Sequence, residues 1–231
     1  MMLKLYHHPF STPSRFVRLM LAEHDAKVEL VVEKTWERRP EFLELNPAGG
    51  VPVLVENDGP PIVGAGPIME YVDETRGYAL GDRRLMPNHP EARAEMRRLV
   101  DWFLHKTHDE AVQYFQHEKI MKLELPRELG GGSPDNQVLR VARVNIKHHL
   151  QYIGWLSGSR NWLSGEQLTF ADLAAAAELS VVDYVGDVPW DEDLNAKYWY
   201  ARIKSRPTFR TLLADRLAGL PAAPIYTDLD F

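Results

Sequence analysis

Two hydroxyl side chains near the start of the chain, Ser11 and Thr12, have the type and position to take part in chemistry. They lie in a loop, His7 to Ser14, just before the amphipathic stretch Arg15 to Glu23, which is predicted to be a helix. The amides and positive dipole end of a helix N-terminus stabilise a thiolate, and a hydroxyl that donates to a sulfur lowers its pKa. Serine and threonine also serve simply as turn and cap residues, so both interpretations stay open.

The chemistry available to the other side chains is restricted. The absence of cysteine excludes a thiolate nucleophile, a disulfide and a cysteine-ligated metal. There are nine histidines; His105 and His108 share a predicted helix face, whereas the adjacent pairs His7-His8 and His148-His149 diverge in direction. None of these spacings matches a known metal motif such as H-E-x-x-H. We therefore predict no metal site and no cofactor.

Composition indicates an ordinary globular protein. The chain has 231 residues, of which 45% are hydrophobic and 26% charged, and its formal net charge is −6. This modest acidity argues against a nucleic-acid partner, which would require a basic stripe. No leader-like start and no apolar run long enough to span a bilayer is found, so we expect a cytoplasmic protein that does not insert into a membrane.

The loop with Ser11 and Thr12 is positioned by a predicted α/β domain covering residues 1–78. Its predicted strands are Leu3–Tyr6, Val28–Val32, Val51–Val55 and Pro61–Val63, and its helices are Arg15–Glu23 and Pro67–Thr75, with a partly helical connection from Trp36 to Leu45. Asp58-Gly59 between the last two strands is a hairpin signal. Pro67 sits just inside a helix start, where its missing N–H has no cost.

An all-helical domain, residues 90–219, is predicted to follow a linker at 79–89. Apolar residues at helical spacing predict a long helix over about 90–120, and Ser133-Pro134 predicts the cap of a helix that reaches Leu156. Thr169 and Asp172 form a capping box before an alanine-rich run. Residues 220–231 are predicted to be a C-terminal tail.

The stretch Asn46-Pro47-x-Gly49-x-Val51-Pro52-x-Leu54 resembles the N-P-x-G-x-V-P-x-L signature of the glutathione transferase superfamily. The Thr169–Asp172 box and Arg206-Pro207-x-Phe209 resemble family motifs of the second domain, so the resemblance covers about residues 3–217. It implies a thioredoxin-like α/β N-terminal domain, an all-α C-terminal domain, a cis bond at Val51–Pro52 and a homodimer.

The chain departs from the family at the position that grips glutathione. The family pattern E/D-S-x-A-I, anchored on Ile68, places its acid and serine at Gly64 and Ala65, so carboxylate and hydroxyl are both absent. Two lost hydrogen bonds to charged groups, at about 1.5–3 kcal/mol each, weaken binding by about two to four decades. We interpret Val51, Pro52, Gly64 and Ala65 as a degenerate glutathione site. A register error, or compensation by water and backbone amides, is the alternative.

Surface residues indicate a protein partner. Trp36 lies in a polar stretch and is either an exposed interface anchor or a side chain packed at the domain edge. Arg140 belongs to a basic cluster, which is either a solvated face or a docking surface for an acidic partner. The chain ends in an alternating acidic and apolar segment. The residues interpreted as partner-binding are Trp36, Arg140, Asp228, Leu229, Asp230 and Phe231.

This ending, on a transferase-like chain without the acid-serine pair, resembles the FtsZ-binding, transferase-like proteins of bacterial cell division. The resemblance implies a non-catalytic homodimer that binds FtsZ filaments at the division site, alters their curvature or bundling, and promotes constriction. The alternative is an active glutathione transferase in which Ser11 or Thr12 activates the sulfur.

Overall fold

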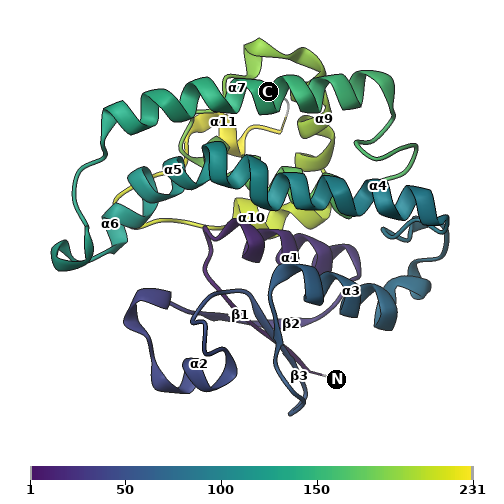
Figure 1. Ribbon diagram of the computed structural model, residues 1–231, viewed down its shortest axis with the longest axis horizontal. Helices are drawn as coiled ribbons and strands as arrows, with labels where there is room; N and C mark the ends of the chain where they lie inside the picture. The colour runs from purple at the N-terminus through teal and green to yellow at the C-terminus, as the bar shows by residue number, and fades with distance from the viewer. Residues whose placement is uncertain (1, 230–231) are drawn as a thin grey trace.

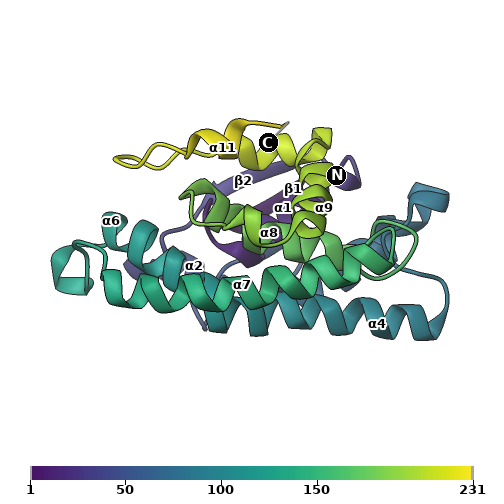
Figure 2. The same ribbon diagram turned by 90° about the horizontal axis from the view of Figure 1, so that it is seen from above.

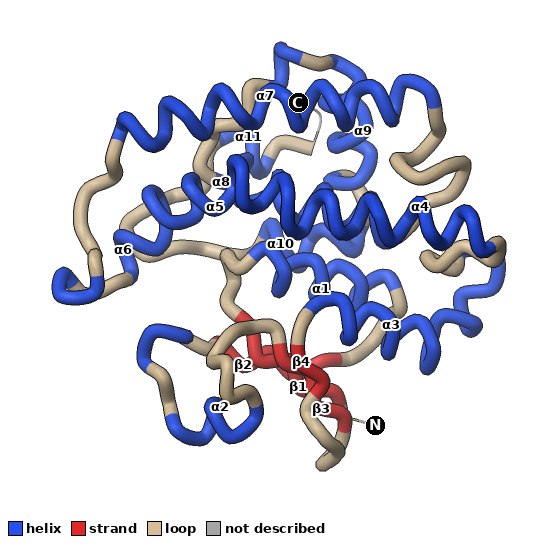
Figure 3. The backbone as a smooth tube through the Cα atoms, viewed as in Figure 1, coloured by secondary structure: helices blue, strands red, loops and turns tan. Residues whose placement is uncertain are grey.

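A computed structural model describes residues 2–229 of the chain. It has a mixed four-stranded sheet at one end and a larger helical part at the other (Figure 1). All four strands lie within the first third of the chain (Figure 3). The strands are β1 (Leu3–His7), β2 (Val28–Val32), β3 (Val53–Glu56) and β4 (Ile62–Val63). The predicted α/β and all-α architecture is therefore confirmed.

The sheet has the order β2-β1-β3-β4, with β1 parallel to β2 and antiparallel to β3. Helices α1 (Thr12–Glu23) and α3 (Ala65–Arg76) lie on its side towards the helical part, and α2 (Pro40–Leu45) lies on the other side (Figure 1). Alternate β1 residues Leu3, Leu5 and His7 are buried, as the alternation in sequence requires. A short helical turn, Thr35–Glu37, precedes α2.

The helical part begins with one long helical run, residues 90–124. It comprises α4 (Pro90–Asp101), α5 (Gln113–Phe115) and α6 (Lys122–Glu124), joined by stretches with π-helical hydrogen bonding at Trp102–Val112 and Gln116–Met121. It continues with α7 (Asn136–Ser159), α8 (Phe170–Tyr184), α9 (Leu194–Lys204), α10 (Arg210–Leu213) and α11 (Pro224–Thr227). No helix within residues 2–229 is both long and apolar enough to cross a membrane.

Helix α8 is the centre of the core, since every one of its side chains is buried. It lies between the α4–α7 layer and α11 (Figure 2) and packs directly against α1. The predicted capping box at its start is confirmed: the Thr169 hydroxyl accepts from Ala171 N, and Asp172 Oδ2 accepts from Thr169 N at 3.0 Å. Asp172 also accepts from Trp199 Nε1, which fixes α9 against α8.

Several predicted boundaries were wrong. Helix α1 begins at Thr12 rather than Arg15, because Ser11 is its N-cap. Helix α7 begins at Asn136, because the Asp135 carboxylate accepts from Gln137 N and Val138 N and so caps the helix in place of Ser133. Strand β3 begins at Val53, since Pro52 has no N–H to give to a ladder.

Two connecting regions are more ordered than the sequence indicates. The 3₁₀-helical turns Gly77–Arg83, interrupted at Gly81, extend from the end of the predicted first domain into the predicted linker at 79–89. The predicted tail contains α11, whose Tyr226 is fully buried. The division of the chain at residues 78, 90 and 220 stays a prediction. Helices α1 and α8, which lie on opposite sides of the predicted linker in sequence, pack directly against each other.

Candidate functional site

A small cavity of about 180 Å³ opens between the sheet and the long helical run. Its lining consists of His8, Ser11, Thr35, Trp36, Gly50, Val51, Gln116 and Met121. An adjoining hollow of about 400 Å³ shares Gln116 and Met121 and adds Gln113, Tyr114 and His117. We call these two hollows together the cleft. The cleft brings together Ser11, Trp36 and Val51, for which the sequence predicted three different roles.

Ser11 is half-buried at the cleft and caps α1. Its Oγ accepts from Ser14 N at 3.4 Å, and no acidic residue occupies the first turn of the helix. The interpretation of Ser11 as a cap is therefore confirmed. Ser11 also belongs to the lining of the cavity.

Thr12 points away from the cleft and is completely buried. Its Oγ1 lies 3.1 Å from His108 Nδ1, and the same nitrogen lies 3.1 Å from Glu178 Oε2. Burial raises the pKa of the Glu178 carboxyl. Desolvation works to lower the pKa of His108, but the hydrogen bond and charge of Glu178 raise it above its usual value. Thr12 thus belongs to a contact between α1 and the helical part, where it does not face a cleft ligand.

The loop before β3 has the expected backbone. The Val51–Pro52 bond is cis, as the family resemblance implied, and Pro52 O accepts from Gly64 N at 3.0 Å. Gly64 is the N-cap of α3, has φ of 92°, and provides no side-chain hydrogen bond to the helix start. Ala65 is mostly buried. Since Pro67 has no N–H, the first turn of α3 presents the amides of Ala65 and Gly66 without carboxylate or hydroxyl.

Trp36 is part of the cleft wall rather than a fully exposed anchor. It is half-buried, and its ring meets that of His8 edge-on, with centroids 5.8 Å apart. His8 is itself buried, and its Nε2 lies 3.0 Å from Glu124 Oε2 on α6. This contact connects the β1–α1 loop to the end of the long helical run. Trp36 and His8 together form one wall of the cleft.

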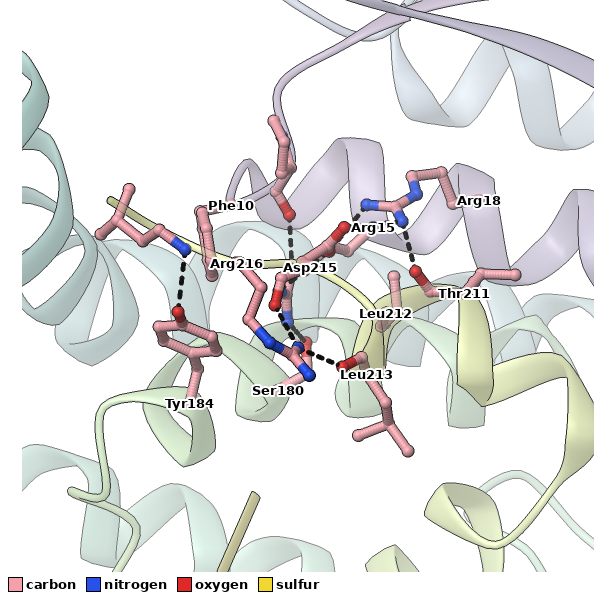
Figure 4. Close-up of polar contacts among 12 residues, drawn as sticks. Phe10, Arg15, Arg18, Ser180, Tyr184, Thr211, Leu212, Leu213, Asp215 and Arg216 are labelled. Atoms are coloured by element: carbon pink, nitrogen blue, oxygen red, sulfur yellow. Dashed lines mark hydrogen bonds and ion pairs between the residues drawn. The ribbon is translucent and has the colours of Figure 1, made fainter. Parts of the chain in front are cut away.

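Arg15 and Arg18, which lie on successive turns of α1, form a buried network with the C-terminal part of the chain (Figure 4). Arg15 donates to Pro9 O at 2.7 Å and to Ser180 Oγ at 2.8 Å. Both guanidinium groups pair with Asp215, at 3.2 Å from Arg15 Nη2 and 2.8 Å from Arg18 Nη1.

Tyr226 completes this network, because its hydroxyl accepts from Arg15 Nη1 at 3.3 Å and donates to Leu212 O at 2.8 Å. We call Arg15, Arg18, Ser180, Asp215 and Tyr226 the clamp. Desolvation works against the charge of Arg15, but Tyr226 and Asp215 keep its pKa above the usual value. Sequence reasoning missed the clamp; the one local signal was an arginine pair, one turn apart, on an otherwise apolar helix.

The remaining predicted partner-binding residues do not line the cleft. Arg140 is exposed on α7, and Asp228 and Leu229 are exposed after α11. Asp230 and Phe231 lie outside the described residues. Among residues 2–229 no three histidine or carboxylate side chains gather closely enough to hold a metal ion. His105 pairs with Asp101 on the surface, whereas His108 turns inward to Glu178.

Comparison with known proteins identifies relatives of both parts. Residues 5–80 match the glutathione S-transferase N-terminal domain, and residues 134–207 match its C-terminal domain. The chain is 44% identical over 230 residues to FtsZ-localized protein A of Caulobacter vibrioides, covering 98% of this chain and 97% of that protein.

Solved structures agree with this comparison. A crystal structure described as a glutathione S-transferase from Sinorhizobium meliloti 1021 superposes with a TM-score of 0.96 at 48% identity, covering 100% of both chains. FzlA from C. crescentus superposes with a TM-score of 0.92 at 43% identity, again covering 100% of both. Relatives named for glutathione transfer and for FtsZ thus share this fold at similar identity.

Proposed function

Since the chain belongs to the glutathione S-transferase family and closely resembles a relative named for FtsZ, we propose that it is a non-catalytic member that binds FtsZ filaments at the bacterial division site. The proposal that the protein is non-catalytic rests on the residues at the start of α3. Gly64 and Ala65 occupy the start of α3, beside the Val51–Pro52 loop, with no carboxylate and no hydroxyl. A glutathione γ-glutamyl group would lose its water there without charged partners, which is costly.

The residues of the cleft wall are better suited to bind a protein than a small charged ligand. Trp36 and His8 provide a rigid aromatic surface beside Val51 and Met121. Aromatic side chains next to a shallow hollow are typical of energetically important positions in protein interfaces. We therefore place the main FtsZ contact at Trp36, with Arg140 and residues 228–231 as further contacts.

Binding by a dimer accounts for the predicted effect on filament curvature and bundling. An aromatic row crosses the long helical run and α7, where Trp102 and Tyr152 have centroids 4.7 Å apart and Tyr152 stacks on Trp155. Trp155 is 63% exposed, and Val141 and Val144 on α7 are also more than half exposed. We propose that a second copy covers this face. Two FtsZ sites on one dimer then join neighbouring filaments.

Co-pelleting with GTP-assembled FtsZ tests the proposal directly. The wild type is expected in the pellet at micromolar concentration, and Trp36→Ala is expected to bind at least about tenfold more weakly. Tyr198→Ala removes an aromatic side chain that is more exposed than Trp36 and lies on α9, outside the lining of the cleft, and is the control. Wild-type protein that stays in the supernatant contradicts FtsZ binding. Equal losses in both variants contradict the placement of the contact at the cleft.

The dimer is tested separately by light scattering. Trp155→Glu places a charge in the proposed interface and is expected to give a monomer of 26.5 kDa. This monomer should still pellet with FtsZ but should no longer bundle filaments in electron micrographs. Wild-type protein that is already monomeric at micromolar concentration would rule out the dimer.

An active glutathione transferase is the second candidate, favoured by the position of Ser11 at the cavity beside Val51. It predicts conjugation of glutathione to chlorodinitrobenzene that is lost in Ser11→Ala. It also predicts a rise in melting temperature with millimolar glutathione, because a ligand that binds only the folded state stabilises it. Absence of both effects removes this candidate.

A further inference from the structure

The guanidinium of Arg15 connects the loop that lines the cleft with the segment that ends the chain. Its Nε donates to Pro9 O, and Pro9 lies between the cleft residues His8 and Ser11. Its Nη1 donates to the hydroxyl of Tyr226, which is 211 residues away in sequence. A single buried side chain therefore has a hydrogen bond to each region.

Helix α11 is held in place by tertiary contacts alone. It has four residues, too few to be stable by itself. The Tyr226 ring packs edge-on against Tyr184 with centroids 5.2 Å apart, and Lys204 Nζ donates to Ile225 O at 2.5 Å. Ala223 N donates to Tyr184 O at 2.9 Å. The position of α11, and of the exposed Asp228 and Leu229 after it, therefore depends on these few contacts.

We propose that Arg15 couples the C-terminal segment to the cleft, so that displacing α11 loosens the His8–Ser11 loop. The guanidinium is a rigid plane with all its donors in fixed directions. If Tyr226 is withdrawn, the plane re-centres on Ser180 and Asp215, and the bond from Nε to Pro9 O is distorted in the same movement. A lysine in this position would break the connection, because its single nitrogen on a flexible stem lacks the fixed plane that reaches Pro9 and Tyr226 together.

The coupling is reciprocal by thermodynamic necessity. A partner that binds Asp228 and Leu229 and pulls α11 away changes the cleft, and a ligand that orders the His8–Ser11 loop favours the docked segment. This inference does not depend on FtsZ being the cleft ligand, since it concerns the free protein.

Hydrogen exchange in the free protein tests the coupling with a matched pair of variants. The reporter is the Ser11 amide, which donates to His8 O at 3.0 Å. Tyr226→Phe removes only the hydroxyl that Arg15 contacts, and should speed exchange at Ser11 by about threefold to tenfold. Tyr184→Phe removes a buried hydroxyl that bonds Leu217 N and Leu220 O but does not bond Arg15. It should leave Ser11 unchanged.

A double-mutant cycle checks that the coupling between Tyr226 and Ser11 passes through Arg15. In an Arg15→Lys background, Tyr226→Phe should have no further effect on Ser11 exchange. An unchanged Ser11 amide in Tyr226→Phe overturns the proposal. Equal acceleration by Tyr226→Phe and Tyr184→Phe also overturns it, because it shows general destabilisation rather than transmission through Arg15.

Discussion

The start of α3 and the clamp on α1 make opposite use of polar groups. At the start of α3, the side chains with which the family pattern holds a small charged ligand are missing, and Gly64 and Ala65 leave backbone amides alone. On α1, Arg15 and Arg18 share Asp215 in the packed interior. Charged side chains are thus concentrated where they join distant parts of the chain.

The comparison shows how little residue type alone says about role. Thr12 was a candidate to activate a thiol, yet, like Arg15, it is completely buried and bonded to the helical part. Ser11, between them and the cleft, is a helix cap with one face on the cavity. The roles of these neighbouring residues are decided by how deeply each is buried more than by the chemistry of its side chain.

The largest expected effect comes from breaking the clamp. Asp215→Ala leaves two buried guanidinium groups without their common carboxylate, which should lower the free energy of unfolding by about 3–5 kcal/mol. The melting temperature should fall by roughly 6–20 °C. Urea unfolding measures the change.

Glu37→Ala is the matched control, because the Lys34–Glu37 pair is half-exposed at 3.9 Å. An exposed pair of this kind contributes little, so the variant should unfold like the wild type. A clamp variant as stable as the Glu37 variant would show that the buried charges do not hold the two parts together.

The pH dependence of stability should come from the cleft end of β1. His7 is buried, and neither ring nitrogen has a hydrogen-bond partner within residues 2–229. Desolvation, assisted by the charges of Arg18 and His8, lowers the pKa of His7 to about 3. Between pH 6.5 and 3 the unfolded chain therefore binds a proton that the folded protein does not, and stability falls as the pH is lowered.

From pH 7.5 to pH 5 this effect should cost about 2 kcal/mol. His7→Asn cannot titrate, so the difference between its unfolding free energies at the two pH values should be smaller by that amount. Because each protein is compared with itself at the two pH values, any effect of the substitution on stability that does not depend on pH cancels. Identical pH dependence in the two proteins would mean that His7 is protonated in the folded state.

The smallest expected effect on stability comes from restoring one group of the family pattern at the start of α3. Ala65→Ser supplies the hydroxyl and, since Ala65 is mostly buried, should lower the free energy of unfolding by about 1 kcal/mol. It should strengthen glutathione binding by about tenfold, through one hydrogen bond to a charged group. Calorimetry or a thermal shift with glutathione measures this.

Gly64→Glu is not an equivalent restoration. Gly64 has φ of 92°, a conformation that side chains with a Cβ avoid, so the acid would add backbone strain. If Ala65→Ser binds glutathione no better than the wild type, the missing hydroxyl is not what distinguishes this cleft.

Much of the fold follows from local patterns. Alternation predicted β1, and β2 has its predicted bounds, Val28–Val32. The Thr169–Asp172 pair predicted the start of α8. The family signature implied the cis bond at Pro52. Each of these depends on neighbours within a few positions, and such information is present in the sequence directly. The boundary errors at α1 and α7 arose where two residues a few positions apart could each cap the helix: Ser11 and Ser14 at α1, Ser133 and Asp135 at α7.

The amino-acid sequence by itself determined which groups are missing at the start of α3, because no folding can supply a carboxylate or hydroxyl at Gly64 and Ala65. Only the tertiary structure decided what the remaining polar groups do. Arg15 meets Ser180 and Tyr226 across 165 and 211 residues, and Thr12 meets His108 across 96. No local pattern encodes such distances, because these contacts exist only after α1 has packed against α8 and removed both side chains from water.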